Sequence, residues 1–202
     1  MSKSSNSKRQ AILLAARHAF ITHGYSGSSV ETIADAAPVS KPTLYKHFKS
    51  KQDLFAAVIE NQCAMLLNTL SSAQAEIRDP VAGLKAIASA FIDLAYSEEA
   101  IKLYRLIIAE QQNFPELGQL VYRSGPEAVL KQLSLYLSEL TAQKILSIQD
   151  IETSSCLFFG MLKGDQHFRC LLGLQSGLAD DQKAQLIEAT VALFLKGHGY
   201  PV

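Results

Sequence analysis

The 202-residue chain contains no tryptophan, only three cysteines and no surplus of charge of either sign. Cys63, Cys156 and Cys170 form no Cys-x-x-Cys pair and no cluster with histidine, so the spacing argues against a zinc site or a redox dithiol. An odd number of scattered cysteines is typical of a reducing compartment with buried thiols. A redox-sensing role for one of them stays open. We expect no metal and no other cofactor.

The sequence also lacks long apolar runs and enzyme motifs. No run reaches the roughly 18–20 residues that a membrane span needs, and the polar N-terminus has no apolar signal core. There is no phosphate-binding loop, no Gly-x-Ser-x-Gly elbow, no His-Glu-x-x-His and no convincing pair of carboxylates. We therefore expect a soluble cytoplasmic protein that is not an enzyme and has no membrane partner.

The zero net charge hides an asymmetry along the chain. Residues 1–51 hold eight basic and two acidic residues, a net charge of +6, so the remainder carries −6. A basic head on an acidic body indicates that the head alone meets a polyanion.

Apolar residues recur at helical spacing throughout, with no alternating strand pattern and no internal repeat. The pattern predicts an all-α fold of about nine helices, with a head at 1–52, a body at 53–202 and disorder at 1–7. Gly125–Pro126 should kink or split one helix. The expected helices lie at about 8–23, 30–36, 40–48, 54–77, 80–95, 97–111, 115–140, 150–174 and 179–196.

Turn residues predict where the first two helices end and begin. Gly24 is placed to be a left-handed C-terminal cap of the first helix. The second helix has two candidate caps: Ser28, which forms a capping-box pattern with Glu31, and Ser29.

The segment Ser40–Phe55 is the most informative of the chain. Ser40 is a good N-cap, and Pro42 falls in the first turn, where its missing N–H costs nothing. Leu44 and Phe48 are four residues apart, so they share one face and dock on a core. A short helix with an apolar back and a donor-rich, cationic front fits the major groove of DNA.

The last two helices carry apolar residues on more than one face. A helix that is wetted on one side needs only one apolar stripe, so two stripes indicate two burial partners. A second copy of the chain is the economical choice, because most soluble oligomers are two-fold dimers. The alternative is that both helices are central in one monomer.

These features resemble the TetR family of transcriptional regulators. The resemblance is specific over residues 8–60 and looser beyond. Its motifs are Ala19–Phe20, His23–Tyr25, Ser29–Ala34, Val39–Phe48 and Lys51–Phe55, then Phe91, Leu103–Gln111, Phe114–Leu117 and the apolar helix around Gly160.

The resemblance implies a three-helix DNA-binding head, a six-helix effector-binding body and a two-fold four-helix bundle made by the last two helices. Carried over by position, Ser29, Tyr45, Lys49 and Lys51 are expected to contact phosphate, with Ser29 acting through its hydroxyl and the start of its helix. Base edges or thymine methyls are expected to meet Lys41, Pro42, Thr43, Lys46 and His47.

One departure concerns the turn before Val39, where the family usually has glycine and this chain has Pro38. Proline does not take positive φ. We therefore expect the preceding helix to end a residue early or the turn to adopt another geometry.

The body is expected to hold a mainly hydrophobic or aromatic effector, because few charged groups fall inside its helices. His167 interrupts an apolar helix and is expected at the dimer interface, although a polar ligand contact is an alternative. Candidate pocket residues are Met65, Phe91, Tyr104, Phe114, Tyr122, Phe158 and Met161. Candidate interface residues are Leu162, His167, Leu171, Leu186 and Leu193.

The predicted function is therefore a homodimeric repressor that a small molecule releases from a palindromic operator. The alternative is a DNA-binding dimer without a small-molecule ligand.

Overall fold

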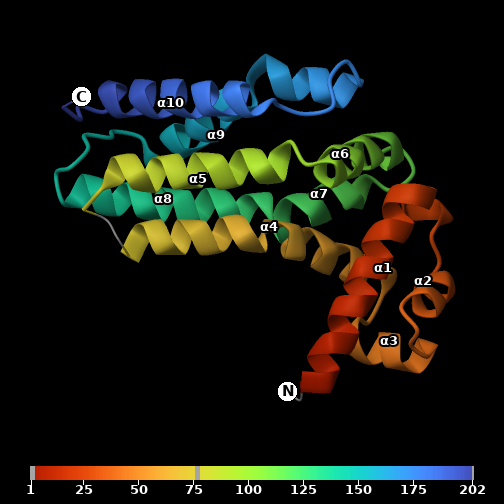
Figure 1. Cartoon of the computed structure of the whole chain (residues 1–202). Coiled ribbons are helices and arrows are strands. Elements are labelled where there is room, and N and C mark those ends of the chain that lie inside the picture. Colours follow the sequence, from red (N-terminus) through yellow and green to blue (C-terminus); the bar gives the residue numbers. More distant parts are fainter. Residues whose placement is uncertain (1–2, 76–77, 202) are drawn as a thin grey trace. The chain divides into compact units, whose positions relative to one another are not determined.

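The computed structural model describes residues 3–75 and 78–201, and within them the chain is helical with no strand (Figure 1). This confirms the all-α prediction. Gly125 and Pro126 split the helix expected over 115–140 in two, so the described residues form ten helices. They are α1 (Lys3–Gly27), α2 (Val30–Ala36), α3 (Lys41–His47), α4 (Lys51–Ala75), α5 (Pro80–Ala95), α6 (Glu98–Glu110), α7 (Pro115–Ser124), α8 (Pro126–Ala142), α9 (Ile151–Leu172) and α10 (Asp180–Gly197).

The chain packs as two compact units. Unit 1 comprises Met1–Gln62 and Lys102–Gly125, and unit 2 comprises Cys63–Ile101 and Pro126–Val202. Helices α4 and α6 each begin in one unit and end in the other. By packing, unit 1 therefore takes in more than the head at 1–52, because most of α6 and all of α7 belong to it.

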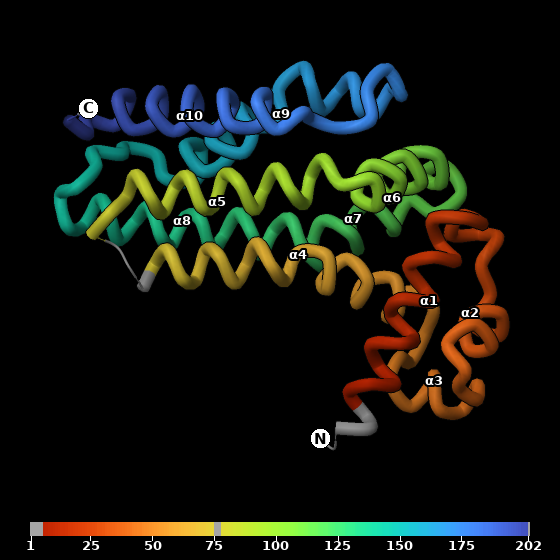
Figure 2. Tube along the Cα trace, in the orientation of Figure 1, coloured from red at the N-terminus to blue at the C-terminus, as the bar shows by residue number. Residues whose placement is uncertain are grey.

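Unit 1 is built on α1, against which α2 and α3 both pack (Figure 2). Aromatic rings form the centre of its core: Phe20 meets Phe55 edge-on at 4.9 Å, and Tyr25 meets both Phe55 and Phe114 at 5.2 Å. Edge-to-face pairs of this kind are favoured by the quadrupoles of the rings. Because Phe114 precedes α7, this cluster ties the α6–α7 segment to the three N-terminal helices.

Helix α1 differs from the prediction at both ends. It begins at Lys3, within the segment 1–7 for which disorder is predicted, and residues 1–2 lie outside the described chain. Extending an existing helix needs no new nucleus, which lets a polar Ser/Asn/Lys segment continue it. At the other end Gly24 has the expected positive φ of 77°, but the chain makes a further turn to Gly27.

The turn before Val39 also differs from the prediction. Helix α2 ends at Ala36 as expected, and the Val39 N–H donates to the Ala34 carbonyl at 3.0 Å. Pro38 itself has a φ of 24°. The turn therefore keeps the positive-φ geometry that glycine favours, which lies outside the range near −65° that a proline ring prefers.

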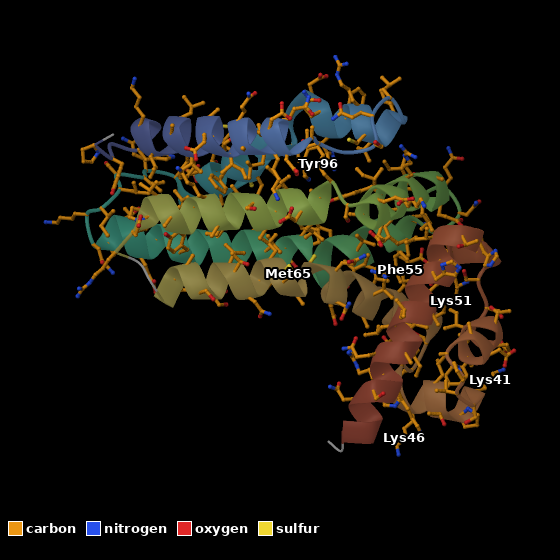
Figure 3. The ribbon with its side chains drawn as sticks, viewed as in Figure 1. Lys41, Lys46, Lys51, Phe55, Met65 and Tyr96 are labelled. Atoms are coloured by element: carbon orange, nitrogen blue, oxygen red, sulfur yellow. The ribbon has the colours of Figure 1, made fainter. Side chains whose placement is uncertain are left out.

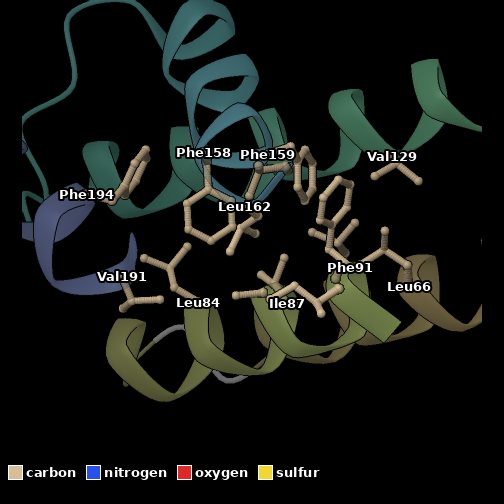
Figure 4. Packing of buried hydrophobic residues seen from close by; sticks show 14 of the residues in the cluster. Leu66, Leu84, Ile87, Phe91, Val129, Phe158, Phe159, Leu162, Val191 and Phe194 are labelled. Atoms are coloured by element: carbon tan, nitrogen blue, oxygen red, sulfur yellow. The ribbon is translucent and has the colours of Figure 1, made fainter. Parts of the chain in front are cut away.

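Unit 2 has one continuous apolar core around Phe158, Leu84 and Ile87, all fully buried (Figure 4). Helix α9 packs against α5, α8 and α10, and α10 packs against α5. The helix expected to continue to Ile77 is described as far as Ala75, since residues 76–77 lie outside the described chain.

Helix α9 is interrupted at Gly164, whose φ of 48° and ψ of −155° break the helical hydrogen bonds. The Tyr96 hydroxyl donates to the freed carbonyls of Leu162 and Lys163 at 3.0 and 2.7 Å. A tyrosine from α5's C-terminal end thus satisfies backbone groups that the break would otherwise leave unpaired in the interior.

The thiols of Cys63 and Cys170 are buried as expected, and burial raises the pKa of Cys63 to about 11. The expectation of burial is wrong for Cys156, which is exposed on α9. None of the described helices is both long enough and apolar enough to cross a bilayer. Across residues 3–75 and 78–201 no three histidine, cysteine or acidic side chains gather as a metal site would require.

Candidate DNA-binding and effector sites

Helix α3 is anchored at its N-terminus and along its back. The Thr43 N–H donates to the Ser40 hydroxyl oxygen at 3.3 Å, and the two hydroxyls lie 2.8 Å apart, which confirms Ser40 as the N-cap. Leu44 is fully buried, and Phe48 is buried behind it. This packing fixes which face of the seven-residue helix reaches solvent.

The opposite face of α3 is open and rich in hydrogen-bond donors. Lys41, Pro42, Tyr45 and Lys46 are exposed, while Thr43 and His47 are partly exposed. Lys49, which follows α3, is exposed as well. Helices α2 and α3 pack together as a helix-turn-helix, and the sticks of Figure 3 show Lys41 and Lys46 on its surface. Such a surface suits phosphates and base edges in a major groove.

The amine of Lys41 does not project freely from α3, because it forms an ion pair and hydrogen bond with Glu31 of α2. That hydrogen bond lowers the pKa of the Glu31 carboxyl and raises the pKa of the Lys41 amine. Both side chains are half exposed. Lys41 must therefore give up its ion pair with Glu31 before its amine can contact DNA.

Ser29 is the N-cap of α2, and its hydroxyl accepts from the Thr32 N–H at 3.1 Å. The Thr32 hydroxyl oxygen in turn accepts a hydrogen bond from the Ser29 N–H at 3.3 Å. The alternative capping box of Ser28 with Glu31 does not form. Ser28 is instead buried, and its hydroxyl donates to the Gly24 carbonyl at 2.7 Å.

Lys51 differs from the other predicted phosphate contacts. Its amine lies 4.5 Å from the centroid of the Tyr25 ring, and burial lowers its pKa. The negative charge of Glu110 acts on it in the opposite direction. The predicted phosphate contact of Lys51 stays a prediction, and a phosphate would have to draw the amine away from the Tyr25 ring.

The predicted effector residues are only partly brought together. Phe91, Phe158 and Met161 lie in unit 2, where Phe91 stacks on Phe159 at 4.4 Å and Phe159 meets Phe158 at 5.7 Å. Tyr104, Phe114 and Tyr122 belong to unit 1, so they are no part of this aromatic cluster.

Two of the predicted pocket residues are mainly exposed. Met65 is 72% exposed and Tyr122 is 51% exposed, so neither side chain lies in the packed interior of its unit. Figure 3 shows Met65 on α4. Their neighbours in the sequence, Leu66 and Val121, are the buried residues at these points of α4 and α7.

The predicted dimer residues divide in the same way. Leu162 and His167 are buried in the monomer, and His167 meets the Tyr96 ring at 5.4 Å, so neither is available to a partner. Leu171 and Leu186 are partly buried, and Leu193 is 63% exposed. The break at Gly164 changes which face of α9 points inward after residue 164, which accounts for the burial of His167 but not for that of Leu162, which precedes the break.

Several exposed apolar residues were missed as interface candidates. Leu157, Phe168 and Leu172 on α9 are each more than half exposed, like Leu193 on α10. A Cβ added at Gly160 or Gly164 would meet no atom within 4 Å, so the backbone is open there too. The second apolar stripe of α9 was the sequence signal that marked this face.

Comparisons with known proteins agree with this geometry. Residues 12–58 match the family model for bacterial regulatory proteins of the tetR family, and residues 82–199 match that for the C-terminal domain of AefR-like transcriptional repressors. The transcriptional activator FasR of Mycolicibacterium smegmatis is 37% identical over 100 residues, which are 50% of this chain and 45% of FasR. The chain thus spans less than half the length of that relative.

Two solved structures are similar over nearly their whole length. A TetR-family regulator from Mesorhizobium loti MAFF303099 superposes with a TM-score of 0.78 at 31% identity, covering 98% of this chain and 100% of that one. The flavonoid-responsive regulator FrrA superposes with a TM-score of 0.71 at 32% identity, covering 95% and 97%.

Proposed function

Because the chain belongs to the TetR family of DNA-binding transcriptional regulators, we propose that it is a homodimeric repressor of a palindromic operator, released by a small hydrophobic effector. The single observation that carries the proposal is helix α3. Its back is fixed by buried Leu44, and its front presents a cationic, donor-rich surface within a helix-turn-helix.

The proposed DNA contacts divide by chemistry. Ser29, Tyr45 and Lys49 contact phosphate and set the register of the head on the duplex. Thr43, Lys46 and His47 read base edges, and Pro42 meets a thymine methyl group. Lys41 joins them once its ion pair with Glu31 opens. Lys51 is left out, because its amine lies over Tyr25.

The dimer is proposed to form through the exposed apolar residues of α9 and α10, namely Leu157, Phe168, Leu172 and Leu193. An apolar patch of this kind on a monomer marks an interaction site. Two-fold pairing sets two copies of α3 about one DNA turn apart, which requires a palindromic site.

The effector is proposed to bind in unit 2 near the aromatic cluster of Phe91, Phe158 and Phe159. Aromatic faces favour a flat or aromatic ligand. The name of FrrA describes that protein as flavonoid-responsive, which supports a ligand of similar chemistry here. The family model of the C-terminal domain, drawn from repressors, supports repression over activation.

The test is selection of bound duplexes from a random DNA pool by the purified chain, followed by titration of the complex with a flavonoid. The proposal predicts one enriched palindrome and its release by the ligand. An enriched palindrome that no small molecule releases supports the alternative of a DNA-binding dimer without a ligand. A pool with no enriched sequence contradicts the proposed function.

A further inference from the structure

The turn between α1 and α2 determines where the helix-turn-helix begins. Gly24 breaks α1 with a φ of 77°, and Ser28 is tied back to the Gly24 carbonyl. Ser29 follows directly as the N-cap of α2. Any change in this turn therefore moves the start of α2, and with it the helix against which α3 packs.

A carboxylate from a distant part of the chain fills this turn. Glu110, the last residue of α6, accepts hydrogen bonds on Oε1 from the Ser26 N–H at 3.0 Å and from the Ser26 hydroxyl at 2.7 Å. A Cβ added at Gly24 would lie only 3.1 Å from the same oxygen. Glu110 is 9% exposed, so the carboxylate is buried within unit 1.

The electrostatics agree with a carboxylate that is held in its charged form. The backbone and side-chain hydrogen bonds of Ser26 lower the pKa of Glu110, and the charge of Lys51 adds to the effect. Hydrogen bonds to an ionised acceptor are stronger than neutral ones, so this contact holds the turn firmly.

From this geometry we infer that Glu110 is a positioning residue for DNA recognition, although it lies outside the head and touches no DNA. It fixes the turn at Ser26, the turn fixes α2, and α2 fixes the angle of α3. The inference rests on the proposed function. The inference extends that function by naming a residue of α6 that positions the recognition helix α3.

The experiment compares two substitutions of Glu110 in the full-length chain. Glu110→Gln keeps an oxygen acceptor for Ser26, whereas Glu110→Ala removes it. The exposed acid Glu60 of unit 1 supplies the control Glu60→Ala. Affinity is measured for the selected palindrome and for a random-sequence duplex, and hydrogen exchange is followed at the Ser26 amide.

A positioning role changes discrimination between the two duplexes. We expect Glu110→Ala to lower the ratio of the two affinities about tenfold, the size of effect that the loss of one good hydrogen-bonding contact has on binding. Glu110→Gln should stay within about twofold of the wild type. Exchange at the Ser26 amide should be faster in Glu110→Ala alone.

A purely structural role gives a different result. In that case Glu110→Ala lowers the melting temperature and leaves the affinity ratio unchanged, which overturns the inference. A Glu110→Gln variant as impaired as Glu110→Ala also overturns it, because the acceptor is then not the feature that matters. If the wild type selects no sequence at all, the proposed function fails, and this inference falls with it.

Discussion

The amine of Lys51 lies 4.5 Å from the centroid of the Tyr25 ring, where the family motif places a residue expected to contact phosphate. The side chain is partly buried, and burial lowers its pKa. Lys49, two residues earlier, is exposed. We therefore propose different roles for the two lysines that flank Ser50: Lys49 contacts the duplex, and Lys51 packs within unit 1.

This difference predicts different salt dependences for the two alanine variants. Lys49→Ala should flatten the slope of log affinity against log salt concentration by about one unit, because one phosphate contact is lost. Lys51→Ala should leave the slope unchanged and lower stability by about 0.5–1 kcal/mol through the lost cation–π contact. Fluorescence anisotropy over a salt series and urea unfolding measure the two quantities. A flatter slope in Lys51→Ala would return that residue to the phosphate contacts.

The ion pair of Lys41 with Glu31 predicts that an acid on the DNA-facing side limits affinity. Glu31→Gln frees Lys41 and removes a charge that repels phosphate, so affinity for any duplex should rise several-fold and the salt slope should steepen by about one unit. Asp35→Asn, on the same helix, is the control for net charge. Equal gains in both variants would show that net charge alone, rather than the pair with Lys41, is responsible.

The exposed leucines predict which face forms the dimer. Leu193→Glu places a charge in the proposed interface on α10 and should give a folded monomer, because a buried unpaired charge costs several kcal/mol. Leu135→Glu, which changes an equally apolar and 47% exposed residue on α8, should remain dimeric. Sedimentation equilibrium distinguishes the two. A dimeric Leu193→Glu, or a monomeric wild type, would refute this choice of face.

The buried histidine predicts loss of stability in acid. Burial, followed by the charge of Lys163, lowers the pKa of His167 below its ordinary value near 6.5. The unfolded chain therefore takes up a proton before the folded one does, and the free energy of unfolding falls as pH drops below about 6.5 towards the folded-state pKa. His198, whose pKa burial also lowers, contributes with the same sign.

Urea midpoints measured across this pH window test the effect. His167→Gln should flatten the dependence, because it removes the group whose folded-state pKa is lowered. An unchanged dependence in His167→Gln would mean that His167 does not keep a lowered pKa in solution.

Helix boundaries were predictable because local chemistry determines them. Ser40 caps α3, Asp79 and Asp150 cap α5 and α9, and Gly125–Pro126 ends one helix and begins another. Each of these signals acts within one helical turn. The apolar back of α3 was predictable for the same reason, since the spacing of Leu44 and Phe48 shows it directly.

Contacts between distant segments were not predictable in this way. The pairing of Glu110 with Ser26 spans 84 positions, and no local pattern marks either residue. The motif likewise gives the position of Lys51 but not the direction of its side chain, whose amine lies over the Tyr25 ring. The burial of His167 was unpredictable for the same reason, because the positive φ of Gly164 rotates the part of α9 that follows it and a regular helical period cannot represent that break.

The most direct test of the account is to run the random-pool selection in parallel with the wild type and with Thr43→Ala, a change on the exposed face of α3. The account predicts that both proteins enrich palindromes with half-sites about one helical turn apart. Thr43→Ala should relax preference at the same base pair of each half-site and leave the others unchanged. Identical sequences from the two proteins, or enrichment of a site without two-fold symmetry, would contradict the claim that a pair of α3 helices reads the DNA.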